Sequence, residues 1–357
     1  MRPRLQRLLA AAGVPLPADG TLPWERLIVV NSIGPLAATA SNIGRNVWNR
    51  GLQIVLLSDG GQPTHYCKFR ALHPLAMVHL ESVLLEAFSA HPSCGRIVPS
   101  TRLARDDRLE VQVARFVAGD RLDRVLPHVS LEAREALTER VLEAARTLAT
   151  AARDIAVLAP RLQAPVSLLR QSESALALLT ELGVDAADTA TIRAALEEAG
   201  EVPAIAQHRD LWPKNLVRAP DGTCQIIDLD EYGDVVVPLY DALHFLRSGD
   251  QSARPDAERL WLQRIVNDDP SARMMRTVLM RDAGRLQLSV RQTLGCLLFY
   301  LVDFPVSIHL RETPEAFWGR YRDELPLAAA WLREAKSLDA LAVRLRLVEA
   351  PPAPGPE

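Results

Sequence analysis

The chain has 357 residues, of which 48% are hydrophobic and 24% are charged; this ordinary globular composition allows two domains or one large two-lobed domain. Its formal net charge of -3 provides no basic surface for phosphate-backbone contacts, so we expect no nucleic-acid partner. The four cysteines lie far apart without a C-x-x-C pair, and the N-terminal segment shows no secretory signal, which together predict a cytoplasmic protein with reduced thiols. The longest apolar run, Leu294 to Val302, is too short to span a bilayer and predicts a buried helix.

The N-terminal part of the chain has the pattern of a β-sheet that carries one helix. A short amphipathic helix is predicted at Met1–Ala12, and apolar runs bounded by turn residues then predict four strands: 28–30, 52–57, 64–69 and 109–117. A helix is predicted from Pro74 to Ala90, because proline is tolerated in a first helical turn and a His-Pro pair follows. Glycine-bearing turns at 31–35 and 41–45 do not match G-x-G-x-x-G, and residues 34–50 have the character of an insertion.

Beyond Ser130, which suits a helix N-cap, the sequence is mostly helical. Apolar residues at helical spacing predict the following helix and six more, at 165–182, 187–199, 255–267, 276–302, 314–324 and 326–347. The helices before residue 201 are rich in Asp and Glu, which fits an acidic wall for an amine-bearing acceptor but is more typical of a solvated helix face. Four prolines at 350–357 predict a disordered tail.

The most informative stretch runs from His208 to Asn215 and fits H-R-D-L-x-x-x-N, the catalytic-loop pattern of kinases, with Asn215 five residues after Asp210. A turn signal separates it from a short apolar strand, Cys224–Ile227, which ends at Asp228. Phosphoryl transfer needs a group that orients the acceptor hydroxyl and takes its proton, and metal ions that neutralise the phosphates. We therefore predict that Asp210 is catalytic and that Asn215 and Asp228 present oxygens to Mg²⁺. The alternative, that these polar residues only cap a loop, does not explain the spacing and the second aspartate together.

This stretch resembles the aminoglycoside phosphotransferase and choline kinase family, the small-molecule branch of the protein-kinase-like fold. The segment IDLDEYGDVVVPLYDALHFL is similar to the family's run at four positions: Asp228, Gly233, Pro238 and Asp241. The chain departs from the family at Arg209, where glycine is usual. Trp212 lies two residues after Asp210, where protein kinases carry lysine. An aromatic residue there is commoner among small-molecule kinases and favours a metabolite or a drug as the acceptor.

The resemblance implies an α+β fold of the bilobal protein-kinase-like type. An N-lobe with an antiparallel sheet and one helix would occupy residues 1–118, and a mostly helical C-lobe would occupy 119–349. ATP would bind between the lobes, against backbone groups of residues 114–117. Gly119 would let the chain cross from one lobe to the other.

The resemblance also implies which residues bind the nucleotide. Lys68 on the third strand would reach the phosphates, and Glu81 on the following helix would hold the lysine. Glu86, on the same helix, is the less favoured partner and more typical of an exposed helix face. Asp230, two residues after Asp228, lies where the family is often acidic, and its role is rated below that of Asp228.

We therefore expect an ATP-dependent kinase that transfers the γ-phosphate to a hydroxyl of a small molecule, such as a sugar, an amino alcohol or an aminoglycoside-like antibiotic. Two alternatives remain open. Arg209 in place of glycine suggests a cell-envelope sugar or protein kinase, although no A-P-E run follows Asp228. The poor glycine loop suggests a nucleotide-binding regulator without turnover, against which the intact Asp210, Asn215 and Asp228 argue.

Overall fold

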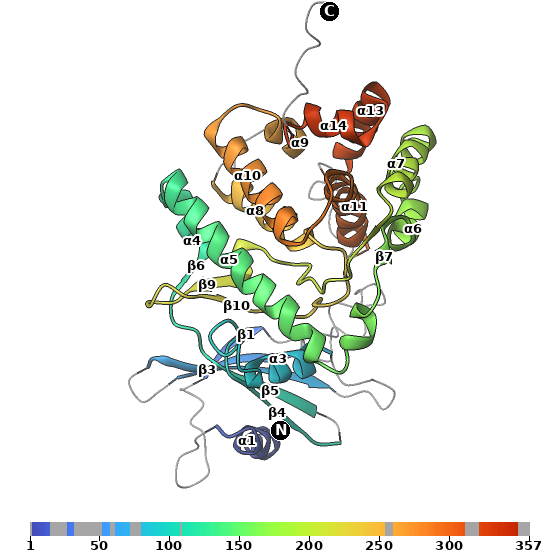
Figure 1. The fold of residues 1–357 in the computed structure, drawn as a ribbon. Coiled ribbons are helices and arrows are strands. Elements are labelled where there is room, and N and C mark those ends of the chain that lie inside the picture. The colour runs from blue at the N-terminus through green and yellow to red at the C-terminus, as the bar shows by residue number, and fades with distance from the viewer. Residues whose placement is uncertain are drawn as a thin grey trace, which may run out of the picture. The chain divides into compact units, whose positions relative to one another are not determined.

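The structure is a computed structural model, drawn as a ribbon in Figure 1. It describes residues 2–14, 27–31, 52–57, 61–71, 80–107, 109–253, 260–310 and 321–348. Some predictions fall outside these residues: the glycine-bearing turns beyond Asn31, the starts of the helices predicted from Pro74 and from Pro255, much of the helix at 314–324, and the tail at 350–357.

The chain divides into two compact units made of interleaved segments. The first unit comprises Met1–Asp120, Thr150–Ile155 and Leu216–Asp230. The second comprises Arg121–Ala149, Ala156–Asn215 and Glu231–Glu357. The first holds an antiparallel sheet and the second is mostly helical, which is the α+β organisation that the sequence predicts.

The first unit contains a five-stranded antiparallel sheet with the strand order β1-β2-β3-β5-β4. Its strands are β1 Leu27–Asn31, β2 Leu52–Leu57, β3 Pro63–Ala71, β4 Thr101–Arg105 and β5 Leu109–Arg115. Strand β4 was not predicted, because two arginines interrupt its apolar pattern and only Thr101 and Ala104 are buried. Short, charged strands of this kind are typical of a sheet edge.

The alternation of side chains along β3 gives the two faces of this sheet different coverings. Cys67 and Phe69 pair with Val113 and Val111 of β5 and pack in one apolar cluster with leucines of helix α1, Arg2–Ala11. Lys68, between them in sequence, points to the opposite face, where helix α3, Leu80–Ala90, lies (Figure 1). Each face of the sheet thus has its own helix, and the lysine is on the α3 side.

A β-hairpin follows the predicted catalytic loop, as the turn signal indicates. Strand β9, Leu216–Arg218, pairs antiparallel with β10, Cys224–Ile226, and Asp221 in the turn accepts the backbone N–H of Thr223 at 3.0 Å. The two-residue strand β6, Asp120–Arg121, begins directly after Gly119. Gly119 has φ +148°, and an added Cβ would lie 2.2 Å from the carbonyl oxygen of Arg218. Only glycine allows this close backbone approach.

Replacing Gly119 by alanine should lower the free energy of unfolding by about 3 kcal/mol, because a Cβ both strains φ and collides with backbone that cannot rotate away. Gly61 is the matched control: its φ is +74° and no atom lies within 4 Å of the added Cβ. Gly61→Ala should cost about 1 kcal/mol, from φ alone. Chemical denaturation measures both values; equal losses would mean that the contact with Arg218 is not tight.

The second unit is built from helices. They are α4 Leu122–Val125, α5 Leu131–Ala151, α6 Leu168–Leu178, α7 Ala186–Ala199, α8 Tyr240–Ala253, α9 Trp261–Ile265, α10 Pro270–Arg285, α11 Val290–His309, α13 Glu324–Ala335 and α14 Leu338–Arg344. Short 3₁₀ turns of this unit lie at Leu126–His128, Ala159–Leu162 and Pro213–Asn215, and a two-stranded ribbon joins β7 Val166–Ser167 to β8 Glu201–Val202. Another 3₁₀ turn, Ala152–Asp154, belongs to the first unit. Ser130 accepts the backbone N–H of Ala133 at 3.2 Å, which confirms it as the N-cap of α5.

Helix α11 is the central element of this unit. Its residues from Thr293 to Val302 are all buried, as predicted for the apolar run. A Cβ on Gly295 would lie 2.4 Å from the Cβ of Ala199 and 2.5 Å from Leu168 Cδ1, so glycine lets α11 pack closely against α7 and α6. Among the described residues, no helix is both long and apolar enough to cross a membrane.

Two predicted helices are each divided in the structure, and one helix was missed. The helix expected at 276–302 is two helices, because Ser289 and Gln292 form a capping box that starts α11. The helix expected at 326–347 is also two, because Lys336 takes a left-handed conformation (φ 62°) and Ser337 then caps α14. Helix α8 was not predicted at all. Its sequence was interpreted only as part of a motif, although its apolar residues have helical spacing.

Candidate active site

The predicted site residues form two groups, one in each unit. Lys68, Glu81 and Asp228 belong to the first unit, and Asp210 and Asn215 belong to the second. Both groups are needed for the chemistry that the sequence predicts.

In the first unit, a buried ion pair joins β3 to α3. Lys68 Nζ donates to Glu81 Oε2 at 2.9 Å, and the two side chains are 5% and 4% exposed. Lysine and glutamate are seldom buried so completely unless they are paired, because each charge must be compensated. Glu86 lies exposed on α3. The structure therefore brings Lys68 to Glu81, the partner that the sequence favours.

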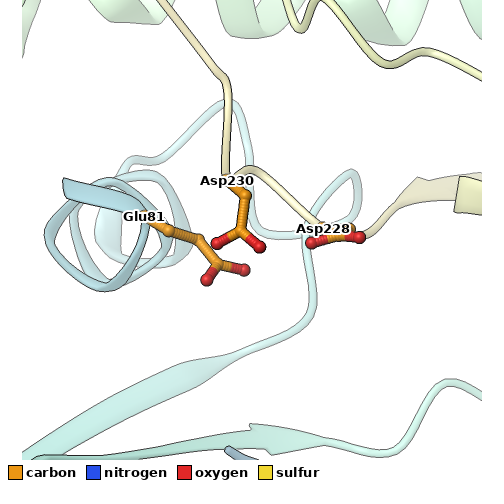
Figure 2. A group of neighbouring side chains, drawn as sticks. All are labelled: Glu81, Asp228 and Asp230. Atoms are coloured by element: carbon orange, nitrogen blue, oxygen red, sulfur yellow. The ribbon is translucent and has the colours of Figure 1, made fainter. Parts of the chain in front are cut away.

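Two aspartates after the β9–β10 hairpin complete this group. Asp230 accepts from Lys68 Nζ at 3.0 Å through Oδ2 and at 3.3 Å through Oδ1, whereas Asp228 Oδ1 lies 4.0 Å away. In Figure 2 the carboxylates of Glu81 and Asp230 are neighbours, and that of Asp228 lies beyond Asp230. One oxygen of each of the three carboxylates lies within 4.8 Å of the others. Asp228 is half-exposed and has φ 66°. Such a conformation costs free energy in a residue with a side chain, so it marks a position that the surrounding structure enforces.

In the second unit, Asn215 holds Asp210. Its Nδ2 donates to Asp210 Oδ2 at 2.9 Å and to the Asp210 carbonyl oxygen, also at 2.9 Å. The five-residue spacing makes this possible, because the 3₁₀ turn Pro213–Asn215 folds the chain back onto the aspartate. Asn215 is buried, while the Asp210 side chain remains 23% exposed and accessible to a substrate.

Asp241, at the start of α8, clamps the backbone of the same loop. Its two carboxylate oxygens accept the backbone N–H groups of His208 at 2.7 Å and Arg209 at 2.9 Å. The Gln207 side chain accepts the N–H of Asp241 at 3.0 Å. Burial raises the pKa of Asp241, and the two N–H donors oppose that rise. Arg209 has φ 69°, so this clamp holds a residue in a region that glycine adopts more easily.

The Arg209 guanidinium has partners inside the same unit. Asp303 lies 3.5 Å away, Asp234 3.6 Å and Glu231 3.8 Å. Burial alone would lower the pKa of Arg209, but these carboxylates raise it above its ordinary value. Tyr240 donates to Asp303 at 2.8 Å, and both its burial and that carboxylate raise the pKa of the phenol. Arg209, at the position where the family usually has glycine, is therefore paired with carboxylates of its own unit.

Comparison with known proteins identifies the family. Residues 53–274, well over half of the chain, match the model of the phosphotransferase enzyme family. The chain belongs to this family. A search of curated proteins gives no significant match.

Two solved phosphotransferase structures are similar to the chain. One is an aminoglycoside-3'-phosphotransferase of type VIII, with 19% identity and a TM-score of 0.40, covering 76% of this chain and 92% of that one. The other is an aminoglycoside phosphotransferase from Streptomyces rimosus in complex with ADP and streptomycin, with 15% identity and a TM-score of 0.38, covering 75% and 99%.

Each unit offers an oxygen atom of the kind that a hard divalent cation binds. Asp228 offers a half-exposed carboxylate, and magnesium in nucleotide sites binds through one or two carboxylates together with phosphate and water. Because the Asn215 amide nitrogen is used by Asp210, its amide oxygen is the atom that remains for a cation. Asp230 is bonded to Lys68 instead.

Sequence reasoning did not find several residues of the site. Asp241 was identified only as a position of the family motif, and the role of Asp230 was rated below that of Asp228. Three other residues were given no role: Tyr240, His244 and Asp303. If residues 240–253 had been interpreted as a helix, Tyr240, Asp241 and His244 would have been placed near its N-terminal end. Asp303 carries no local signal, since it lies within an apolar helix 94 residues after Arg209.

Proposed function

We propose that the chain is an ATP-dependent phosphotransferase that moves the γ-phosphate to a hydroxyl group of a small molecule. The observation that carries this proposal is the Asp210–Asn215 contact, which presents an accessible carboxylate from a loop clamped by Asp241. Asp210 would orient the acceptor hydroxyl and take its proton. Membership of the phosphotransferase family supports the reaction class.

Lys68 and Glu81 would act on the nucleotide. In the present structure the ammonium group of Lys68 is shared between Glu81 and Asp230. We infer that the phosphates of ATP take the place of Asp230, while Glu81 stays and keeps the lysine in position. Asp228 and Asn215 would hold Mg²⁺, which would supply positive charge to the phosphates. The ADP in the Streptomyces rimosus enzyme is consistent with a nucleotide donor here.

The acceptor would be a hydroxyl-bearing small molecule: a sugar, an amino alcohol or an aminoglycoside-like antibiotic. The acidic residues at 181–201 do not argue for an amine-bearing acceptor, because Asp185 caps α7 and Asp188 pairs with Arg333 at 2.6 Å. No nucleic-acid partner is proposed, given the net charge of -3. The use of ATP and four buried cysteine thiols fit a cytoplasmic setting.

The two alternatives have less support. A cell-envelope sugar or protein kinase was suggested by Arg209, but that arginine is engaged with Asp303, Asp234 and Glu231 within its own unit. A nucleotide-binding regulator without turnover needs no catalytic aspartate. The hydrogen bond from Asn215 to the Asp210 carboxylate therefore favours the enzyme over the regulator. The position of the glycine loop lies outside the described residues.

A phosphotransfer assay over a panel of sugars, amino alcohols and antibiotics tests the proposal. With ATP and Mg²⁺ we expect at least one acceptor to stimulate ADP release and to gain one phosphate in the mass spectrum. EDTA should abolish both signals, because the phosphate charges are then uncompensated. Equal ATP affinity with and without magnesium in a calorimetric titration would refute the metal assignment.

A further inference from the structure

His244 lies buried on α8, directly behind the predicted catalytic aspartate. Its Nε2 is 4.0 Å from Asp210 Oδ1, and the residue is 1% exposed. The ring packs against Trp212 at 5.2 Å and Phe304 at 4.6 Å between centroids. Placing an imidazole among aromatic rings costs free energy unless its nitrogens are used. None of the roles assigned above uses this histidine.

A line of buried polar groups reaches the imidazole from its other side. Glu324 on α13 accepts from Arg247 at 2.8 Å, and the Arg247 guanidinium lies 6.0 Å from the centroid of the Tyr300 ring. The Tyr300 oxygen in turn lies 3.3 Å from His244 Nδ1. All four side chains are at most 3% exposed and belong to the second unit.

The direction of these hydrogen bonds follows from what each group can donate. The guanidinium beside Tyr300 has no acceptor, whereas His244 Nδ1 lies 3.3 Å from the phenol oxygen and can accept the phenol proton. Burial raises the pKa of Tyr300, which keeps that proton on the phenol. A neutral imidazole that accepts at Nδ1 carries its own proton on Nε2, the nitrogen that faces Asp210.

We propose that His244 is a positioning residue for Asp210: its Nε2–H fixes the rotation of the carboxylate through Oδ1, while Asn215 holds Oδ2. The proposal rests on the proposed function, in which Asp210 orients the acceptor hydroxyl. At 4.0 Å the contact is longer than a hydrogen bond. Catalytic hydrogen bonds are often long without substrate and shorten in the complex. Tyr300 contributes by donating to Nδ1 of the imidazole, which keeps the imidazole proton on Nε2.

Substitutions at His244 separate positioning from packing. His244→Leu should lower kcat roughly ten- to a hundredfold, the range for one hydrogen bond to a charged group, with the KM for ATP unchanged. His244→Gln places an amide N–H near the position of Nε2 and should recover most of this loss. Tyr300→Phe should lower kcat by a smaller factor, because the tautomer is then no longer selected.

Phe299→Leu is the control for lost aromatic packing. Phe299 is buried next to Tyr300 on α11 and contacts the ring of Tyr240, 6.0 Å between centroids. It should lower Tm about as much as His244→Leu does and leave kcat unchanged. An equal fall in kcat for both variants, or no rescue by His244→Gln, would overturn the positioning role. In an Asp210→Asn background, His244→Leu should reduce the residual rate no further.

The tautomer can be measured without turnover. In ¹⁵N-histidine NMR of the full chain, the His244 signals, assigned by their loss in His244→Gln, should show the proton on Nε2 and should shift in Asp210→Asn. If the NMR signals show the proton on Nδ1 and an unprotonated Nε2, the inference is overturned even if phosphotransfer is found. If instead no acceptor is phosphorylated but the tautomer is as stated, the proposed function fails and the Asp210–His244 contact stands as a structural one.

Discussion

Replacing Asp210 by asparagine should lower kcat by at least about a hundredfold while ATP binds with near-normal affinity. The side chain would act on the acceptor hydroxyl and on its proton, and no contact with the nucleotide is assigned to it. Asparagine keeps the shape of the side chain and offers an oxygen to Asn215 Nδ2, which now donates to Asp210 Oδ2 at 2.9 Å. What it loses is the negative charge and the ability to accept a proton. The effect should therefore appear in turnover with the acceptor.

Three measurements on Asp210→Asn define the result. Calorimetric titration gives the affinity for ATP with magnesium, the assay with the acceptor gives kcat, and a thermal melt reports the fold. Asp188→Asn is a control that removes a carboxylate from an ion pair elsewhere in the same unit, with Arg333. It should leave kcat and ATP affinity unchanged. A variant of Asp210 with full turnover would eliminate this residue as the base and leave the regulator alternative to be tested.

The part of the site that could be predicted depends on short-range sequence. The contact between Asp210 and Asn215 needs only a five-residue loop with one tight turn, so the sequence spacing by itself limits its geometry. Strand alternation explains only why Lys68 faces away from Cys67. The pairing of Lys68 with Glu81, 13 residues later on the next helix, was implied by the resemblance to kinases, and the structure places the two groups 2.9 Å apart.

The residues that were not predicted depend on contacts between distant elements. Arg209 meets Asp303, and His244 meets Tyr300 56 residues further on. Which face of α11 turns toward α8 is decided by the packing of whole helices, and no local pattern reveals it. The divided helices are different, because the Ser289–Gln292 capping box is a local signal that was present and was overlooked.

Lys68→Ala should abolish most phosphotransfer and should also destabilise the protein. The lysine would contact the phosphates, and its loss removes a charge that is needed throughout the reaction. It would also leave Glu81, 4% exposed, as a buried carboxylate without its cation. Breaking a buried ion pair from one side typically costs about 3–5 kcal/mol. A single substitution therefore cannot distinguish a role in nucleotide binding from one in folding.

A double variant separates the two roles. Lys68→Met with Glu81→Gln removes both charges and keeps the volumes, so the free energy of unfolding should return to within about 1.5 kcal/mol of the wild type. ATP affinity and kcat should stay as low as in Lys68→Ala, because no cation then reaches the phosphates. Glu81→Gln alone keeps the lysine and should reduce kcat more mildly, while Glu86→Gln on the exposed face of α3 should change neither quantity. Recovery of turnover together with stability in the double variant would show that Lys68 serves only the fold and would refute its assignment to the phosphates.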